Sequence, residues 1–204
     1  MHVTVFGAAG RLGRQILRAA RDRGFTVTAH ARRLMSDSEP SIEWTTGDAG
    51  SAVKGADAVL VVFGPRTPSD VPICATETEQ ILSAMRQHGV TRFLCVTGAM
   101  VGDYPKNRTW CFQLLATWIQ WRFQRSMEDR SRQEMLIRSS EINWTVFKPP
   151  RLTSGNSGGR IMAGPAIRVG MLSSIARADL AAAMIKEAEQ GRFIGQCVFV
   201  KSAH

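Results

Sequence analysis

The sequence predicts a single α/β domain, residues 1–204, with a doubly wound, mostly parallel β-sheet and helices on both of its faces. Three observations favour this fold. Strand-like and helix-like segments alternate along the whole chain. Residues 57–63 (DAVLVVF) are almost wholly apolar, which is typical of a strand covered on both faces. A chain of 204 residues with 44% hydrophobic residues suits one domain with a sizeable core.

Apolar spacing and terminating glycines define the elements of the first half. Residues 2–6 are a β-rich run closed by a glycine, and residues 11–23 have a helical periodicity that also ends at a glycine. Residues 25–30 and 42–46 are predicted to be the second and third strands. The buried run at 57–63 is then the fourth strand.

The second half continues the alternation, with two interruptions. Its expected elements are a helix at about 76–88, a strand at 92–97, helices near 127–139 and 177–190, and strands at 143–147 and 197–200. Residues 107–125 are an insertion rich in aromatic side chains, and residues 153–164 are rich in glycine and serine. We expect both segments to be loops or to be carried on loops near the carboxyl ends of the strands, where open α/β sheets bind ligands.

The charge balance favours a phosphate-bearing ligand over a nucleic acid. The chain has 26 basic and 17 acidic residues, a net charge of +9, which is typical of proteins with polyanionic partners. The arginines are spread along the chain, and those of the first predicted helix (Arg11, Arg14, Arg18 and Arg21) share one solvated face. We therefore expect no nucleic-acid partner.

The sequence also predicts a cytoplasmic protein without a membrane span or a metal site. No apolar run has the length of a membrane-spanning helix, and the first residues lack the pattern of a secretory signal. The four cysteines form no C-x-x-C pair and have no histidine nearby, so they are expected to be free thiols in a reducing compartment. They are Cys74, Cys95, Cys111 and Cys197.

A glycine pattern between the first strand and the first helix predicts a dinucleotide site of the Rossmann type. Gly7, Gly10 and Gly13 follow the spacing G-x-x-G-x-x-G: the first permits a tight turn, the second lets backbone approach a pyrophosphate, and the third lets the helix pack on the sheet. The helix amino terminus then offers free N–H groups to phosphate. The residues between these glycines that complete the predicted site are Ala9, Arg11 and Leu12.

The end of the second strand selects the cofactor. NAD sites place an acidic residue there to bind the adenosine ribose, whereas this chain has Arg32 and Arg33. A guanidinium can bind a 2′-phosphate through two hydrogen bonds, and an acid would repel that phosphate. We therefore predict NADPH as the cofactor. Later strand ends add Asp48 and Ala49 near the adenine, and Phe63, Gly64 and Pro65 beside the cofactor.

Four stretches carry a resemblance to a known family. They are VTVFGAAGRLGRQIL, GDAGSAVKGADAVLVVFG, ILSAMRQHGVTRFLCVTGA and IRSSEINWTVFKPPRL. With Arg32 after the second strand, the chain resembles the atypical short-chain dehydrogenases/reductases of the NAD(P)H-binding, NmrA-like group. Within that group it looks most like the biliverdin IXβ reductase and flavin reductase family. The likeness covers most of the chain except the aromatic insertion.

The resemblance implies roles for individual positions. The glycine turn would hold the pyrophosphate and Arg32 the 2′-phosphate. Thr97 takes the place of the family's active-site serine and, with Gly98 and Ala99, would lie beside the nicotinamide. The opposite wall of that pocket would be formed by Pro149, Pro150 and Arg151.

One departure from the family concerns proton donation. Ordinary short-chain dehydrogenases carry Y-x-x-x-K on the helix after this strand, with the tyrosine as proton donor. The matching residues here are 126–130 (SMEDR), and the single tyrosine, Tyr104, falls in a predicted loop. The catalytic candidates are therefore Thr97 and Arg130. The acceptor would take its proton from water, or the protein would bind the cofactor without chemistry.

The aromatic insertion at 107–125 is predicted to be a lid over the substrate. Trp110, Trp118 and Trp121 would supply flat apolar walls for a conjugated ring, and Arg122 would meet an anionic group on it. With Ala99, these are the predicted substrate-binding residues. The alternatives for the segment are a subunit contact, ordinary core packing and a membrane-surface role.

The prediction for function is an NADPH-dependent reductase that transfers hydride to a planar, conjugated small molecule such as a flavin, linear tetrapyrrole or quinone. The main alternative is a non-catalytic NADP(H)-binding redox sensor of the NmrA type, and an isomerase or epimerase with retained cofactor is a third. A monomer or a homodimer is expected.

Overall fold

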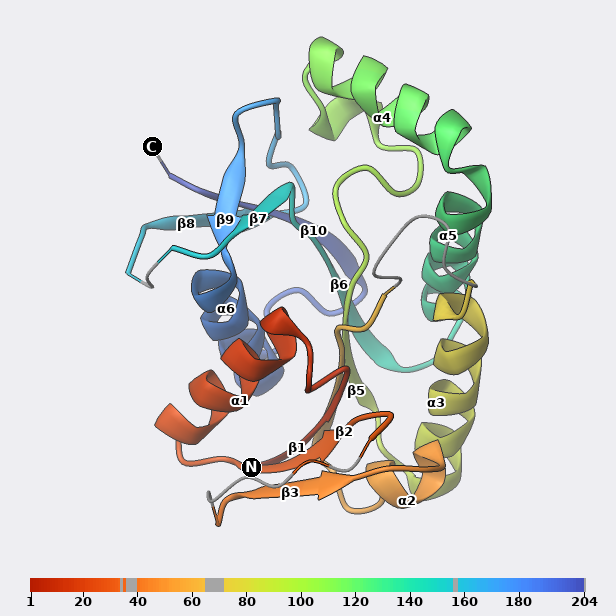
Figure 1. Ribbon diagram of the computed structural model, residues 1–204, viewed down its shortest axis with the longest axis vertical. Coiled ribbons are helices and arrows are strands. Elements are labelled where there is room, and N and C mark those ends of the chain that lie inside the picture. The colour runs from red at the N-terminus through yellow and green to blue at the C-terminus, as the bar shows by residue number, and fades with distance from the viewer. Residues whose placement is uncertain (34, 36–39, 65–71, 156–157, 204) are drawn as a thin grey trace.

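The computed structural model describes residues 1–33, 35, 40–64, 72–155 and 158–203 (Figure 1). Its centre is an eight-stranded sheet with the order β3-β2-β1-β4-β5-β6-β10-β8. All neighbouring strands are parallel except β10 and β8. The strands are β1 (His2–Phe6), β2 (Thr26–His30), β3 (Ile42–Thr45), β4 (Ala58–Val61), β5 (Arg92–Val96), β6 (Asn143–Lys148), β8 (Ile161–Gly164) and β10 (Gln196–Ser202). The doubly wound sheet that the sequence predicts is therefore confirmed.

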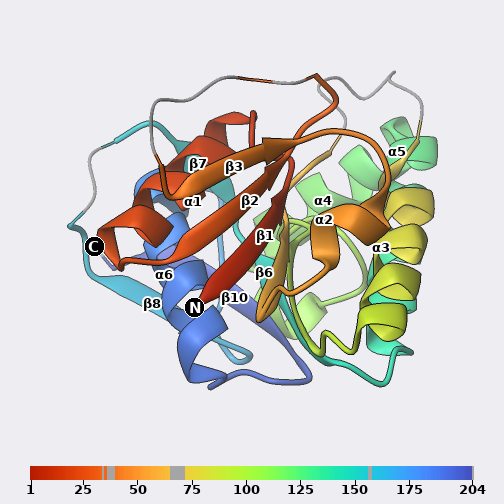
Figure 2. The same cartoon turned by 90° about the horizontal axis from the view of Figure 1, so that it is seen from below.

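Helices cover both faces of this sheet. Figure 1 shows α1 (Arg11–Asp22) and α6 (Arg177–Gln190) on one face, and α3 (Cys74–His88) and α5 (Gln124–Arg138) on the other, while Figure 2 shows the same two layers from below. The short helix α2 (Ala49–Val53) lies beside α3. It was not predicted from the sequence, because five residues that include a glycine give no helical periodicity.

The core consists of two apolar layers separated by the sheet. On one side Ile16 of α1 and Leu180 of α6 pack against strand residues such as Leu60. On the other side Ile81 of α3 and Ile137 of α5 pack against the opposite faces of the same strands. Every residue of β4 is buried, which explains why its sequence is continuously apolar and not alternating.

The glycine- and serine-rich segment, expected to be a loop or an element carried on one, ends in a strand of the central sheet. Residues 161–164 form β8, which pairs antiparallel with β10 at the edge of the sheet. Two further short strands, β7 (Arg151–Thr153) and β9 (Ser174–Ala176), form a separate parallel pair. Propensity within 153–164 is weak, so this strand depends on its partner β10, which the local sequence does not reveal.

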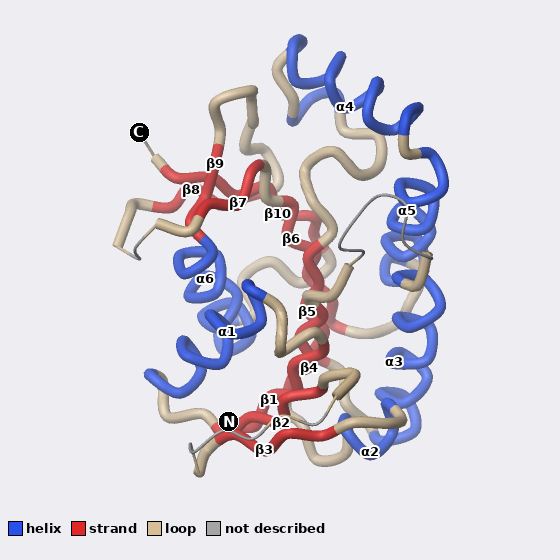
Figure 3. The backbone as a smooth tube through the Cα atoms, in the orientation of Figure 1, coloured by secondary structure: helices blue, strands red, loops and turns tan. Residues whose placement is uncertain are grey.

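The aromatic insertion is helical and is continuous with the next helix. A 3-10 turn, η1 (Pro105–Asn107), leads into α4 (Trp110–Arg122), and α5 begins at Gln124, earlier than the predicted start near residue 127. Phe123 is the single non-helical residue between the two helices. Figure 3 shows α4 extending beyond the carboxyl ends of β5 and β6. No helix within the described ranges combines the length and hydropathy needed to cross a bilayer.

Candidate cofactor and substrate site

The glycine turn after β1 has the close packing that its sequence predicts. Gly7 has a φ of 85°, a left-handed conformation that favours glycine, and a Cβ there would lie 2.7 Å from the backbone nitrogen of Phe63. A Cβ at Gly13 would lie 2.6 Å from the carbonyl oxygen of Ala8 and would overlap that of Gly7. The turn is closed by a hydrogen bond of 3.0 Å from the Gly10 N–H to the Gly7 carbonyl. A side chain at Gly7 or Gly13 would therefore prevent the turn from packing this closely against β4 and α1.

The amino terminus of α1 is suited to an anion. Gly10 is the N-cap residue, among the described residues no side chain caps this helix, and its first turn contains no acid. The first N–H groups of a helix lack intrahelical partners and carry positive partial charge, so a phosphate placed there accepts hydrogen bonds from backbone. Arg11, the first helical residue, is exposed and adds a positive side chain. The turn therefore fits a dinucleotide pyrophosphate.

The two arginines after β2 lie at the same edge of the sheet. Because β1 and β2 are parallel neighbours with Phe6 opposite His30, the chain that follows each strand emerges side by side. Arg32 and Arg33 are both exposed, so their guanidinium groups are free to meet a ligand. This placement suits a phosphate on the adenosine ribose.

Asp48 has a structural role in addition to the predicted one. Its carboxylate caps α2, accepting from the Ser51 N–H at 2.9 Å and from the Ser51 hydroxyl at 3.0 Å. These hydrogen bonds lower the pKa of Asp48. Ala49, the first residue of α2, follows it at the end of β3. An adenine contact by either residue stays a prediction.

Arg130 of α5 spans the ends of β4 and β5. Its guanidinium donates to the backbone carbonyl of Thr97 at 2.7 Å and occupies the position that a Cβ on Gly64 would need. The two residues proposed from sequence as catalytic are thus brought together, with Phe63 and Gly64 beside them. Pro65 lies outside the described residues.

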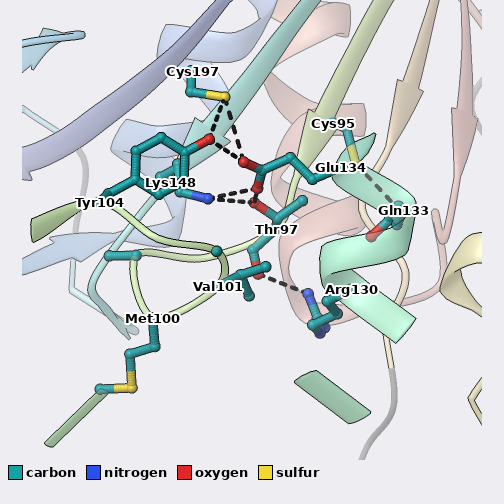
Figure 4. A network of polar contacts seen from close by, with 12 residues as sticks. Cys95, Thr97, Met100, Val101, Tyr104, Arg130, Gln133, Glu134, Lys148 and Cys197 are labelled. Atoms are coloured by element: carbon teal, nitrogen blue, oxygen red, sulfur yellow. Dashed lines mark hydrogen bonds and ion pairs between the residues drawn. The ribbon is translucent and has the colours of Figure 1, made fainter. Parts of the chain in front are cut away.

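The Thr97 side chain belongs to a buried polar network (Figure 4). Lys148, at the end of β6, forms an ion pair of 2.6 Å with Glu134 of α5 and donates to the Thr97 hydroxyl at 3.4 Å. Thr97 itself donates to Glu134 at 3.2 Å. Tyr104 donates its phenol proton to the other carboxylate oxygen of Glu134 and contacts the Cys197 thiol at 3.2 Å.

Burial in this network shifts the pKa values of Lys148 and Tyr104. Burial lowers the pKa of Lys148, and the adjacent Glu134 carboxylate opposes that shift. Burial, together with hydrogen bonds to Cys197 and Glu134, raises the pKa of Tyr104. A tyrosine that acts as proton donor in catalysis needs a pKa brought down toward neutrality, and the environment of Tyr104 does the opposite. The environment of Tyr104 thus differs from one that lowers the pKa of a tyrosine proton donor.

The residues predicted for the opposite wall of the nicotinamide pocket follow β6. Pro149 is buried and its carbonyl accepts from the Ala99 N–H at 2.8 Å, which joins the ends of β5 and β6. Pro150 is half-buried and Arg151, on β7, is exposed. Gly98 has a φ of 115°, so a side chain there would be strained. Ala99 is buried against Phe112, Val169 and Phe199, away from solvent.

An open groove of about 1400 Å³ runs between α4, α5 and the start of α3. Trp121 and Arg125 line it, together with Glu134 and the loop at Tyr104. Trp110, Trp118 and Arg122 do not line this groove. Their contact with a substrate stays a prediction, and so does the role of α4 as a lid.

Sequence reasoning missed the buried charged residues. Lys148 enters only through the resemblance, Arg108 only as the residue four positions after Tyr104, and nothing in the sequence points to Glu134. A lysine inside the apolar run NWTVFK, directly before two prolines, is the one local signal of a buried cation. The described parts of the chain contain no group of three or more His, Cys, Asp or Glu side chains placed to hold a metal ion.

Comparison with known proteins identifies related chains. A family model described as NAD(P)H-binding matches residues 7–190. The photosystem II assembly factor Ycf39 of Synechocystis is 29% identical over 119 residues, which is 52% of this chain and 36% of that protein. The chain thus matches about a third of the length of this curated relative.

Solved structures share the fold over the whole chain. The oxidoreductase ylbE from Lactococcus lactis superposes with a TM-score of 0.82 at 16% identity, over 100% of this chain and 91% of its own. A proposed NADH-flavin reductase from Streptococcus pneumoniae superposes with a TM-score of 0.78 at 23% identity, over 100% of both chains. At such identities the likeness establishes the Rossmann fold.

Proposed function

This chain belongs to the NAD(P)H-binding family, and from that premise we propose that it is an NADPH-dependent reductase of a planar, conjugated small molecule. The observation that carries the proposal is the pairing of an uncapped glycine turn at α1 with two exposed arginines after the neighbouring strand. The first fits a pyrophosphate and the second a 2′-phosphate, so together they fit the adenosine half of NADPH.

The remaining site residues support orientation of the two reactants. When bound, NADPH supplies a hydride at its nicotinamide ring. Thr97, Gly98 and Pro149 stand at the adjoining ends of β5 and β6, where that ring would lie if the adenosine half occupies the turn. Arg130 fixes the Thr97 backbone there. Correct alignment of donor and acceptor supplies a large share of the rate of such transfers.

The class of hydride acceptor that we propose is supported by the environment of Tyr104, the single tyrosine that could donate a proton. Tyr104 has a raised pKa and its hydroxyl hydrogen-bonds to Glu134 and Cys197, which supports an acceptor that does not need a proton from a tyrosine. Flavins, linear tetrapyrroles and quinones spread incoming charge over a conjugated system and can take a proton from water. The groove beside Trp121 and Arg125 offers an aromatic and a cationic contact for such a ring.

The hydrogen bonds of the Thr97 hydroxyl favour one other candidate function. Because its hydroxyl is held by Lys148 and Glu134 inside the protein, it is poorly placed to meet a reacting atom. A non-catalytic NADP(H)-binding regulatory protein would tolerate that arrangement.

Steady-state oxidation of NADPH with a panel of flavin, biliverdin and quinone acceptors distinguishes the two. We expect turnover with at least one acceptor and a higher kcat/KM for NADPH than for NADH. Tight binding of both NADPH and NADP⁺ without turnover on any acceptor would support the regulatory protein. Absence of binding in calorimetry would contradict both.

A further inference from the structure

The outward face of α4 carries a stripe of large apolar side chains. Trp110, Trp118 and Trp121 are 75%, 55% and 74% exposed, and Leu114 between them is exposed as well. Their spacing of four, four and three residues puts them on one side of the helix. The buried residues of α4, Phe112 and Ala116, lie on the opposite side and fasten it to the protein. We call Trp110, Leu114, Trp118 and Trp121 the aromatic stripe.

A neighbouring loop extends this apolar surface. The segment before β9 pairs with the start of α4, with a hydrogen bond of 2.9 Å from the Thr109 N–H to the Val169 carbonyl. The next residues of that segment, Met171 and Leu172, are exposed. Figure 1 shows this loop and α4 at the same end of the molecule, beyond the carboxyl ends of the strands.

All charged residues of these two segments are basic. Residues 105–125 and 165–173 contain five basic residues and no acidic residue. Four are exposed: Lys106, Arg122, Arg125 and Arg168. The acidic residues that flank the first segment, Asp103 and Glu128, line the same groove as Trp121 and Arg125. The two segments that present the aromatic stripe and its neighbouring loop thus carry a net positive charge, on a protein with a net charge of +9.

We propose that the aromatic stripe docks the protein on an anionic phospholipid bilayer. Tryptophan side chains are stable at the boundary between headgroups and acyl chains, and an amphipathic helix with a basic border binds that boundary without crossing it. Anionic headgroups complement Lys106, Arg122, Arg125 and Arg168.

Charge argues against a second copy of this chain as the occupant. If two copies met stripe to stripe, their basic borders would face each other with no acid on either contact segment to compensate. A bilayer removes the same apolar surface from water and supplies the missing negative charge. The proposal rests on α4 and its border alone, and it holds whether or not the protein is a reductase.

Flotation with lipid vesicles tests the proposal on the full chain. We expect binding to vesicles of phosphatidylcholine with about one third phosphatidylglycerol to exceed binding to pure phosphatidylcholine by about tenfold or more, and to fall with added salt. The double variant Trp110→Ser/Trp118→Ser should lose about tenfold in partitioning because it removes apolar area from the interface. Replacement of Arg122 by Gln should lose about fivefold, with the loss suppressed at high salt.

Matched controls lie away from α4. Ile194 is an exposed apolar residue beside the amino end of β6, and Lys186 is an exposed lysine on α6. Ile194→Ser and Lys186→Gln should bind vesicles as the parent does. Circular dichroism and the thermal midpoint check that each variant folds.

Two outcomes overturn the proposal. One is equal or absent binding to anionic and neutral vesicles by the folded parent protein. The other is a dimer in sedimentation velocity that the Trp110→Ser/Trp118→Ser variant abolishes, without vesicle binding, which would make the stripe a subunit interface. NADPH titration of the same samples keeps a failure here separate from a failure of the proposed reductase.

Discussion

At the residue scale, the preference for NADPH that we propose depends on Arg32. Arg32 follows β2 directly, at the edge where the glycine turn lies, and is exposed. A guanidinium bound to a phosphate contributes about 1.5–3 kcal/mol.

Replacement of Arg32 by Ala is expected to weaken NADPH binding by about tenfold to a hundredfold and to leave NADH binding nearly unchanged, since only NADPH carries the 2′-phosphate. Calorimetric titration with both cofactors measures the difference. Arg86→Ala, at the far end of α3, is the control because it removes an exposed arginine elsewhere. An equal loss of affinity for NADPH and NADH would mean that Arg32 contributes only its positive charge and does not bind the 2′-phosphate.

The Lys148–Glu134 ion pair is expected to be costly to break from one side. Both side chains are buried, so Lys148→Met leaves a carboxylate without its cation and should lower the free energy of unfolding by about 3–5 kcal/mol. The double variant Lys148→Met/Glu134→Gln should recover part of that loss because no uncompensated charge remains. Urea denaturation of the parent and these variants measures both effects. A single variant within about 1 kcal/mol of the parent would show that the pair is solvated.

The buried thiols predict instability in alkaline solution. Burial raises the pKa of Cys74 from 9.0 to about 11. Below pH 9 both the folded and unfolded forms keep the proton, and as the pH rises from 9 toward 11 the unfolded chain releases it first, so unfolding becomes easier. The free energy of unfolding should fall by up to about 1.4 kcal/mol per pH unit for each such thiol. Cys74→Ala should reduce this slope, and Cys111→Ala, at an exposed thiol, should not.

The residues of the site differ in how far sequence reasoning could find them. Gly7, Gly10 and Gly13 are close in the chain and their demands are local, so the turn was predictable. Tyr104 and Glu134 are 30 positions apart, and Lys148 is 14 from Glu134, and they meet only through the order of β5, β6 and α5. No spacing rule links residues that are joined by sheet topology.

At the scale of elements, a buried arginine helps to attach α4. Arg108 is 2% exposed, and its guanidinium donates to the carbonyls of Ala99 at 2.8 Å, Val101 at 3.1 Å and Gly102 at 2.8 Å, and to the Gln113 side chain at 3.0 Å. It therefore joins the loop after β5 to the first turn of α4. The apolar residues of this segment recur at helical spacing, but Ile119, Trp121 and Phe123 broaden the pattern, and no spacing rule links Arg108 to the loop that it contacts.

Arg108→Met should leave the carbonyls of Ala99 and Val101 without this donor, while Gly102 keeps its hydrogen bond from Gln120, and should destabilise α4 more than the sheet. We expect a loss of about 3 kcal/mol or more in the free energy of unfolding. Hydrogen exchange should rise at 110–122 and change little in β4 and β5. Uniform acceleration over the whole chain would contradict this local role. Lys106→Met, an exposed cation in the same segment, is the control.

For the molecule as a whole, the sheet order brings the glycine turn, the ends of β4 to β6 and α4 to one end. A ligand that binds only the folded form stabilises it by about 2.7 kcal/mol at a hundred times its dissociation constant. Saturating NADPH is therefore expected to raise the thermal midpoint by about 5–10 °C for a domain of this size. Differential scanning fluorimetry with NADPH and NADH at equal concentration checks this. A larger rise with NADH would contradict the cofactor assignment.

The contacts of Arg108 have a consequence for protein engineering. Arg108 and the groups that it contacts all lie within residues 99–113, so this segment contains the complete set of these hydrogen bonds. A chimera that exchanges residues 99–125 between two family members therefore transfers α4 together with Arg108 and its hydrogen-bond partners. One that begins at Trp110 separates α4 from Arg108 and leaves Phe112, Ala116 and the Gln120 hydrogen bond to Met100 as attachments, so the graft should be more sensitive to protease.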